Sequence, residues 1–264
     1  MVGSYVDFGI KTDRDSLDVT DLKEVLNACW KYKPEVILHL AAEADVDRCE
    51  REPEHAYAVN SIGTYNMAIA ARELDAKLIY VSTAGVFDGR KQCPYTEEDK
   101  PNPLNYYGHS KYLGELAVRG MLKNYIIARA DWMFGGGQGK DKKIVAKIIE
   151  QFNKPEFFGV NDNLGSPTFG KDLIAAIKRL IADNAAGLFH LANKGACSSY
   201  EFIKEVVYIL GQDIKVRPVN SSFFKLDATR WANKSLDSRV DLMQPWQEAL
   251  KEYLETEWKL FIKK

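Results

Sequence analysis

The sequence carries almost no net charge and no long apolar run. Its 264 residues contain 36 Lys and Arg against 37 Asp and Glu, which gives a formal net charge of −1. Because acids and bases are interspersed, nothing favours binding to nucleic acid or to an anionic membrane, and a small molecule is the expected partner. No stretch approaches the roughly 18 apolar residues of a membrane span, and residues 1–15 lack the basic-then-apolar pattern of an export signal. We therefore expect a cytoplasmic protein.

Cysteine and histidine are too few and too scattered for a metal or disulfide framework. The four cysteines form no CxxC pair, so reduced thiols in the cytoplasm are expected. His39 lies in an apolar run and is expected to be a hydrogen-bonded core residue. His109 has no histidine or carboxylate partner at metal-ligand spacing. The sequence therefore predicts no metal site.

Short apolar runs alternate with longer amphipathic ones. With 46% hydrophobic residues, the chain can bury the core of one large domain or of a main domain with a smaller lobe. The alternation predicts an α/β fold, in which a parallel sheet is covered by helices. The expected strands are residues 5–10, 35–41, 77–83 and 125–130, and the expected helices are residues 22–32, 53–74, 106–122, 141–152, 172–183 and 199–210, followed by an amphipathic helix from residue 247 to 262.

Tyr107 and Lys111 stand four residues apart on an expected helix, so both side chains lie on one face. A nearby cation favours the phenolate and lowers the pKa of a tyrosine, which can then give a proton to a carbonyl that is being reduced. Thr83 ends the run KLIYVST, and ligands bind at the carboxyl ends of parallel strands. Because YxxxK also occurs by chance in many helices, a purely structural role for this spacing stays open.

Several ordered motifs resemble the extended short-chain dehydrogenase/reductase family, and within it the dTDP-4-dehydrorhamnose reductases. The resemblance covers nearly the whole chain and is carried by LDVTD (17–21), HLAAEADVDRCEREPEHAYAVN (39–60), YVSTAGVFDG (80–89), PYTEEDKPNPLNYYGHSK (94–111), RADWMFG (129–135), LGSPTFGKDL (164–173) and RWANKSLDS (230–238). It implies a Rossmann-type doubly wound parallel sheet in residues 1–135. Residues 136–264 would then form mainly a smaller substrate lobe, with some segments returning to the main domain.

The resemblance also implies roles for single residues. Thr83, Tyr107 and Lys111 match the catalytic hydroxyl, tyrosine and lysine of the family. The positions that match its cofactor site are Asp18, Val19, Ala41, Ala42, Asn60 and Lys111, and those that match its substrate site are Ala84, Trp132, Arg230 and Asn233. Structural roles compete for several of these, since Trp132 could be a core residue, Asn60 a buried polar group with a backbone partner and Arg230 a surface charge.

Two departures from the family pattern affect these expectations. The reductases usually read STDYVFDG, whereas Ala84 and Gly85 here replace a carboxylate and an aromatic residue beside Thr83, which leaves the substrate identity open. Family members also begin with a strand and a GxxGxxG loop that holds the cofactor pyrophosphate. The run at residues 5–10 aligns with their second strand, so the first strand and the loop are expected to be missing from the sequence as written, by omission rather than by degeneration.

Two further stretches suggest supporting parts of a site. The glycine-rich residues 135–139 open onto KDKK rather than onto a helix, so a lid-like loop near the substrate is expected instead of a phosphate cradle. Lys11 and Arg14 follow the first expected strand. This basic pair could hold a ribose 2′-phosphate and so favour NADP(H), although solvated surface charge is an equal alternative.

The resemblance implies reduction, dependent on NADP(H) or NAD(H), of the 4-keto group of a nucleotide-linked deoxysugar, by an enzyme that could be a homodimer. Two other readings stay open. A nucleotide-sugar epimerase or dehydratase of the same fold would interconvert sugars with no net use of reduced cofactor. A non-catalytic regulatory subunit, similar to the β subunit of methionine adenosyltransferase, would keep the fold and bind a protein partner.

Overall fold

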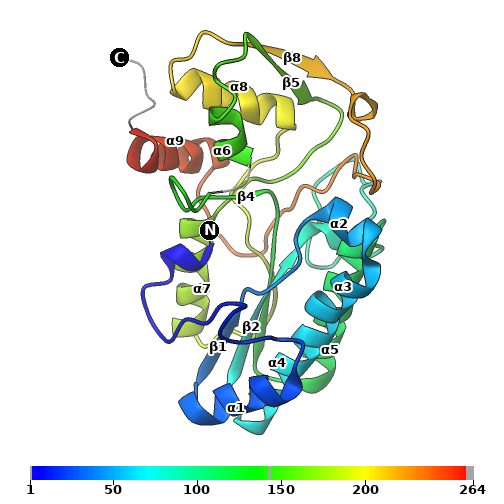
Figure 1. Ribbon diagram of the computed structural model, residues 1–264, viewed down its shortest axis with the longest axis vertical. Coiled ribbons are helices and arrows are strands. Elements are labelled where there is room, and N and C mark those ends of the chain that lie inside the picture. The colour runs from blue at the N-terminus through cyan, green and yellow to red at the C-terminus, as the bar shows by residue number, and fades with distance from the viewer. Residues whose placement is uncertain (1, 142–143, 260–264) are drawn as a thin grey trace.

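The computed structural model describes residues 2–141 and 144–259, and its centre is a parallel sheet. The sheet consists of β1 (Val36–His39), β2 (Lys77–Thr83), β3 (Tyr125–Ala130) and β7 (Gly187–His190), in the order β1-β2-β3-β7. Every residue of β2 is buried, as expected for a strand that is covered on both faces. The expected α/β architecture with a parallel sheet is therefore confirmed (Figure 1).

Helices cover both faces of this sheet. On one face, clusters of small and aliphatic side chains join the strands to the longer helices, whereas α7 packs on the opposite face with Val2 and Val6. Aspartate and asparagine side chains cap three of these helices and thereby fix where they begin: Asp21 caps α1, Asp45 caps α2, and Asn105 caps α5. The helices are α1 (Leu22–Tyr32), α2 (Val46–Arg51), α3 (Pro53–Tyr57), α4 (Gly63–Glu73), α5 (Tyr106–Met121) and α7 (Gly170–Ala182).

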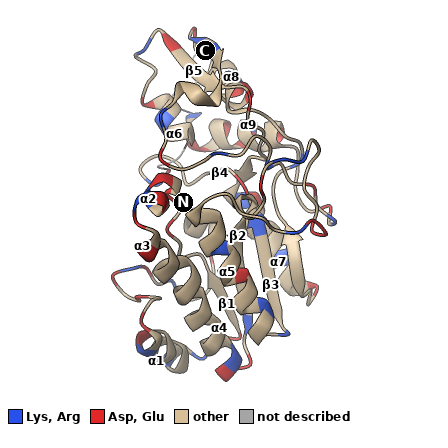
Figure 2. Cartoon of the chain, turned by 90° about the vertical axis from the view of Figure 1, so that its right-hand side faces the viewer, with Lys and Arg blue, Asp and Glu red and all other residues tan. Residues whose placement is uncertain are grey.

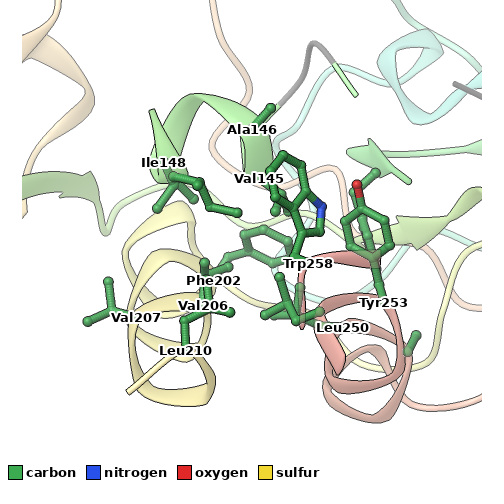
Figure 3. Packing of buried hydrophobic residues seen from close by; sticks show 14 of the residues in the cluster. Val145, Ala146, Ile148, Phe202, Val206, Val207, Leu210, Leu250, Tyr253 and Trp258 are labelled. Carbon is green, nitrogen blue, oxygen red and sulfur yellow. The ribbon is translucent and has the colours of Figure 1, made fainter. Parts of the chain in front are cut away.

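A second group of elements lies beyond the carboxyl end of the sheet (Figure 1). It contains α6 (Ile144–Ile149), α8 (Ser199–Ile209), α9 (Trp246–Glu257) and the parallel pair β5 (Glu156–Val160) and β8 (Lys215–Val219). Figure 3 shows Ile148, Phe202, Leu250 and Tyr253 packed together in its core. The short strands β4 (Met133–Phe134) and β6 (Thr168–Phe169) pair between the two groups. β7 belongs to the main sheet although it comes after residue 135 in the chain. The expected boundary between two domains at residue 135 stays a prediction.

Charged residues are distributed over both groups of elements. Figure 2 shows lysine and arginine interspersed with aspartate and glutamate, in line with the balanced composition. All four cysteines are free. Among the described helices, none is both long and apolar enough to cross a membrane.

Some of the expected elements are wrong or incomplete. Residues 5–10 do not form a strand: a 3-10 helix spans Val2–Tyr5, and the chain then turns at Gly9 with φ 71°. Residues 7–10 are exposed, so this segment lacks the burial that an apolar strand needs. The helix expected at 53–74 is interrupted by a π turn at Ala58–Ile62. The helices expected at 141–152 and 247–262 lie partly outside the described residues.

Candidate functional site

The carboxyl end of β2 and the first turn of α5 meet at one edge of the sheet. Thr83 is the last residue of β2 and pairs in register with Ala130. The Asn105 side chain accepts a hydrogen bond from the backbone of Gly108 at 2.9 Å, and Gly108 packs directly on the backbone of Gly85. A glycine at 108 lets the helix approach the loop that follows Thr83. The structure therefore brings Thr83 and Tyr107 to the same place, as the sequence predicted.

Thr83 is almost completely buried, and its side-chain oxygen accepts a hydrogen bond from Gly85 N at 3.0 Å. A threonine hydroxyl has one hydrogen to donate besides the lone pairs that accept. Because the backbone of Gly85 uses a lone pair, the Thr83 O–H can still act as a donor toward a neighbouring oxygen. A side-chain hydrogen bond between Thr83 and Tyr107 favours a lower pKa of the phenol.

The pKa of Tyr107 differs from the expectation drawn from sequence. Burial raises the pKa of this phenol to about 12, and the Thr83 side chain opposes that rise only in part. The prediction that a neighbouring cation would lower the pKa is wrong for this state of the chain, because the loss of hydration dominates. The phenol is therefore protonated at neutral pH, and a protonated phenol is the form that can give a proton to a developing alkoxide.

Lys111 lies on α5 with its side chain against β2, and it is only 2% exposed. Its ammonium donates a hydrogen bond to the carbonyl of Val81 at 2.8 Å and lies 4.2 Å from the centre of the Tyr80 ring. Burial lowers the pKa of Lys111 to about 7, while the carboxylate of Glu115 acts in the opposite direction. The lysine is thus a cation that titrates near neutral pH, held on the same helix as Tyr107.

Asn60 supports the loop that follows β1. It is fully buried within the π turn, where its side-chain oxygen accepts from Glu43 N at 2.9 Å and its amide donates to Glu43 O and to Ser110 Oγ, each at 3.0 Å. π turns are often found at functional sites. Ala41 and Ala42 lie in this loop with exposed side chains. Asn60 thus holds the loop of Ala41 and Ala42, where the cofactor is expected, through the backbone of Glu43. A direct role of Asn60 in cofactor binding stays a prediction.

A buried hydrogen-bond chain runs from Asn60 to His39. The Thr64 hydroxyl donates to Asn60 O at 2.7 Å, so it accepts from His39 Nε2, which lies 3.1 Å away. His39 also stacks on Tyr80 with ring centres 5.7 Å apart. Burial, helped by the charge of Lys111, lowers the pKa of His39 to about 3. The prediction of a hydrogen-bonded core histidine is therefore confirmed.

Because the pKa of His39 is lowered, we expect the free energy of unfolding to decrease in acid. This pKa is about 3 when folded and about 6.5 when unfolded, so the unfolded chain binds the extra proton as the pH falls. The contribution is fully present above the unfolded pKa and should fall by about 2 kcal/mol between pH 7 and pH 5. Replacement of His39 by Gln, whose amide can still donate to Thr64, should flatten this dependence. Denaturant unfolding of both proteins at the two pH values would measure it, and equal slopes would contradict the prediction.

Asp18 and Val19 lie on the outer side of α4. The Asp18 carboxylate is exposed and accepts from the backbone and hydroxyl of Thr20 at 2.9 and 2.8 Å, which lowers its pKa. Val19 packs so closely on Gly63 that a side-chain carbon at 63 would stand 2.7 Å from it. Gly63 is one helical turn from Asn60, so Val19 contacts the helical segment that holds the loop after β1 through Glu43. Lys11 and Arg14 are both exposed.

The residues expected at the substrate site lie in different surroundings. Ala84 is fully buried in the short 3-10 helix Ala84–Val86, so it offers no surface of its own. Arg230 pairs with Asp47 on α2 at 2.6 Å, and the same carboxylate accepts from Ala228 N. These contacts anchor the late segment near the loop that follows β1.

Asn233 and Trp132 hold different parts of the site. The Asn233 amide donates to the carbonyls of Lys91 and Cys93 at 2.8 and 3.3 Å, and it is 6% exposed, so this side chain stabilises a loop. Trp132, two residues after the end of β3, has a positive φ of 32°, a conformation that non-glycine residues adopt rarely. Strain of this kind is often found at functional sites.

Sequence reasoning missed a charged and aromatic cluster beside Trp132. Asp131 is buried and pairs with Lys234, whose ammonium lies 5.5 Å from the ring centre of Trp132 and 4.9 Å from that of Trp231. Burial raises the pKa of Asp131, and Lys234 acts against that rise. Trp231 packs on Gly85, where an added side-chain carbon would be 3.1 Å from its ring. The available signal was a carboxylate directly after an apolar strand.

The glycine-rich stretch forms a loop with positive φ at Gly135, Gly136, Gly137 and Gly139. The backbone N–H of Gly136 donates to the Tyr5 hydroxyl at 2.6 Å, and that of Gly137 donates to the Tyr253 hydroxyl at 3.3 Å. The described part of this loop is therefore anchored at two points, and its expected role as a lid stays a prediction. Within residues 2–141 and 144–259, no cluster of three or more His, Cys, Asp or Glu side chains could hold a metal ion.

The chain is similar to a well-defined group of proteins. Residues 7–258 match the family described as the RmlD substrate binding domain. The spore coat polysaccharide biosynthesis protein SpsK of Bacillus subtilis is 33% identical, over 93% of this chain and 88% of the relative. A dTDP-4-dehydrorhamnose reductase of Sinorhizobium fredii is 36% identical, over 84% of this chain and 78% of the relative.

Solved structures agree with these sequence matches. A dTDP-4-dehydrorhamnose reductase of Clostridium acetobutylicum superposes with a TM-score of 0.90 and 34% identity, over 93% of this chain and 89% of the other. The corresponding reductase of Bacillus anthracis, solved in complex with NADP, gives a TM-score of 0.89 and 33% identity, over 92% and 88% of the two chains.

Proposed function

The chain belongs to the RmlD substrate binding domain family, and we propose that it reduces the 4-keto group of a nucleotide-linked deoxysugar with NADPH or NADH. One observation carries this proposal: Thr83, at the end of β2, lies beside Tyr107 at the carboxyl edge of the sheet. Tyr107 stands on α5, the helix that also contains Lys111. Several relatives are named dTDP-4-dehydrorhamnose reductase, so dTDP-4-dehydro-L-rhamnose is the substrate to test first.

The described residues supply part of a dinucleotide site on the side of β1, without the glycine-rich loop that holds the pyrophosphate in the family. Ala41 and Ala42 follow that strand with small, exposed side chains, which leaves its carboxyl end uncovered where ligands bind in parallel sheets. Asn60 holds this loop in place through Glu43. The exposed Lys11 and Arg14 support a preference for a 2′-phosphate. A bound NAD(P)H would supply the hydride.

The chain's own residues then have distinct tasks. Thr83 donates its hydroxyl hydrogen to the sugar carbonyl oxygen and orients it. Tyr107, neutral because burial keeps its pKa near 12, gives its proton to the oxygen as negative charge develops there. The cationic Lys111 stabilises the phenolate that this transfer leaves behind. Trp132, the Trp231–Lys234 contact and Arg230, which pairs with Asp47 on α2, would bound the sugar nucleotide.

A direct assay tests this proposal. The purified chain is mixed with dTDP-4-dehydro-L-rhamnose and NADPH, and both the loss of NADPH absorbance and the sugar product are followed, with NADH in a parallel reaction. Stoichiometric formation of the reduced sugar is expected. Sugar interconversion without net use of NADPH would favour an epimerase, and inactivity combined with capture of a stable protein partner would favour a regulatory subunit.

Two expectations accompany the proposed activity. We propose a cytoplasmic location, which the four free cysteines support because reducing compartments keep thiols unpaired. We also propose a homodimer, by analogy within the family. Light scattering of the purified chain would measure its mass in solution, and a monomer at micromolar concentration would contradict the second expectation.

A further inference from the structure

A buried charged network lies directly beneath the candidate site. Glu115 accepts three hydrogen bonds: from Ser82 Oγ at 2.6 Å, from Arg129 Nε at 2.9 Å and from Arg129 Nη2 at 2.6 Å. The side chain of Glu115 is fully buried, and that of Arg129 is 1% exposed. The network therefore connects α5 to both β2 and β3, one residue before Thr83 on β2.

The position of Glu115 on α5 relates it to the candidate catalytic residues. Tyr107, Lys111 and Glu115 follow one another at intervals of four, so all three lie on the face that packs against the sheet. Two hydrogen bonds from one guanidinium to one carboxylate fix both distance and orientation. Because this pair lies one helical turn beyond Lys111, it sets how α5 presents Lys111 and Tyr107 to the end of β2.

The far side of the network is equally constrained. The Arg129 guanidinium lies 5.0 Å from the centre of the Phe87 ring, and its Nη1 lies 3.5 Å from His190 Nε2. His190 Nδ1 lies 3.1 Å from the carbonyl oxygen of Tyr95 and 2.8 Å from that of Asp237. Arg129 is thus contacted on several sides. If the carboxylate of Glu115 moved away, the buried cation of Arg129 would lose its ionic partner.

Stability alone is a weak reason for such an arrangement. Two charges lose their hydration on burial, and apolar residues of similar volume often stabilise a fold as well as a buried ion pair does or better. The environment of Lys111 offers another reason. The titratable groups that face it or act on it come from four elements: Tyr107 and Glu115 on α5, Tyr80 on β2, His39 on β1 and Cys49 on α2.

We propose that Glu115, clamped by Ser82 and Arg129, is a positioning residue that keeps the Lys111 side chain cationic and directed at the sheet edge. The neighbouring His39, Tyr80 and Tyr107 are neutral at physiological pH, because burial lowers the pKa of the histidine and raises those of the tyrosines. The negative charge of Glu115 is therefore what offsets the burial of the ammonium. The consequence for catalysis rests on the proposed reductase function, whereas the effect on Lys111 does not.

The first test removes the carboxylate charge and keeps the size of the side chain. In the variant Glu115→Gln, the pKa of Lys111 should fall by on the order of one pH unit, because an attractive charge at short range is lost and the cation of Arg129 stays. In the double variant Glu115→Gln with Arg129→Met, neither charge is left buried alone, and a smaller fall is expected because charges of both signs are removed. Selective ¹³C labelling of lysine and NMR titration would report this value, with the Lys111 signal assigned by its loss in Lys111→Arg. An unchanged value in Glu115→Gln would overturn the inference, whether or not the chain reduces sugars.

Reductase activity gives the second readout. Lys111 acts as a cation, so activity is present below its pKa and is lost as the pH rises through it; the alkaline limb of kcat should therefore move to lower pH in Glu115→Gln. Asp172→Asn is the matched control, because this partly buried carboxylate accepts from Asn193 and Gln244 and belongs to another network. It should leave the limb in place. A limb shifted equally by Asp172→Asn would reduce Glu115 to a structural role.

Two arrangements keep the inference separable from folding and from the proposed function. If Glu115→Gln does not fold, Glu115→Asp keeps the charge but draws it back by one methylene, and a smaller downward movement of the Lys111 value is expected; no movement would overturn the inference. If the unmodified chain has no reductase activity, the proposed function fails, while the NMR titration still decides the role of Glu115.

Discussion

Replacement of Tyr107 by Phe should lower kcat for the 4-keto sugar by about 10³-fold, because the change removes the hydroxyl that gives the proton to the developing alkoxide. The phenylalanine ring fills nearly the same volume, so the fold and cofactor binding should be retained. The measurement is the rate of NADPH loss at saturating substrate, together with thermal unfolding and NADPH titration of the same protein.

Tyr106 provides the matched control for this variant. It precedes Tyr107 on α5 but is 41% exposed and packs edge-to-face with Tyr57 instead of facing the sheet. Tyr106→Phe should therefore leave kcat within about twofold of the unmodified chain. If Tyr107→Phe kept full activity while Tyr106→Phe lost it, the proton donor would be assigned to the wrong tyrosine.

The electrostatics of the site also bear on the pH profile. Because burial raises the pKa of Tyr107 to about 12 and lowers that of Lys111 to about 7, the lysine loses its proton first as the pH rises. The alkaline limb of activity therefore reports Lys111 and not the phenol. A cofactor whose negative charges lie close to the ammonium would move this limb to higher pH, since an opposite charge favours the cation.

The sequence predicted those parts of the fold in which local pattern and burial agree. Residues 77–83 and 125–130 were predicted as strands because both are continuous apolar runs, and both are strands with the same limits in the structure. β4 and β6 have only two residues each, too few to produce a periodic signal. β8 contains Pro218 and is mostly exposed, so neither its composition nor its hydrophobicity resembles a buried strand.

The site divides in a similar way. Thr83 and Tyr107 were expected at one site because Thr83 ends an expected strand, Tyr107 begins an expected helix, and both match catalytic positions of the family that the chain resembles. The pKa values could not be predicted, since they depend on the depth of burial of each side chain. The pair Asp131–Lys234 joins residues 103 positions apart, and no local pattern links them.

Gly108 is the position at which one added carbon should do the most damage to the site. A side-chain carbon there would stand 2.1 Å from the carbonyl oxygen and 2.9 Å from the carbonyl carbon of Gly85. Both are backbone atoms, which cannot turn aside as a flexible side chain can. Gly108→Ala should therefore destabilise the protein by roughly 3 kcal/mol. Denaturant unfolding followed by circular dichroism would measure the loss.

The same helix contains the control. Gly120 also lies in α5, but nothing stands within 4 Å of a carbon added there. Gly120→Ala should stabilise the fold by about 0.5–1 kcal/mol, because alanine loses less conformational freedom than glycine in a helix. A destabilisation of equal size in both variants would mean that α5 resists alanine for a reason other than contact with Gly85.

The activity of the Gly108 variant connects this packing to the chemistry. To accept the new carbon, α5 must withdraw from the loop that follows β2, and Gly85 is only two residues from Thr83. Withdrawal would separate the Thr83 hydroxyl from Tyr107, and misplacement of reacting groups by about 1 Å can cost about 10²-fold in rate. In the fraction that stays folded, kcat should fall by about that factor while Gly120→Ala keeps full activity. Equal activity in both variants would mean that the two side chains need not be held together, and the proposed division of labour between Thr83 and Tyr107 would then be wrong.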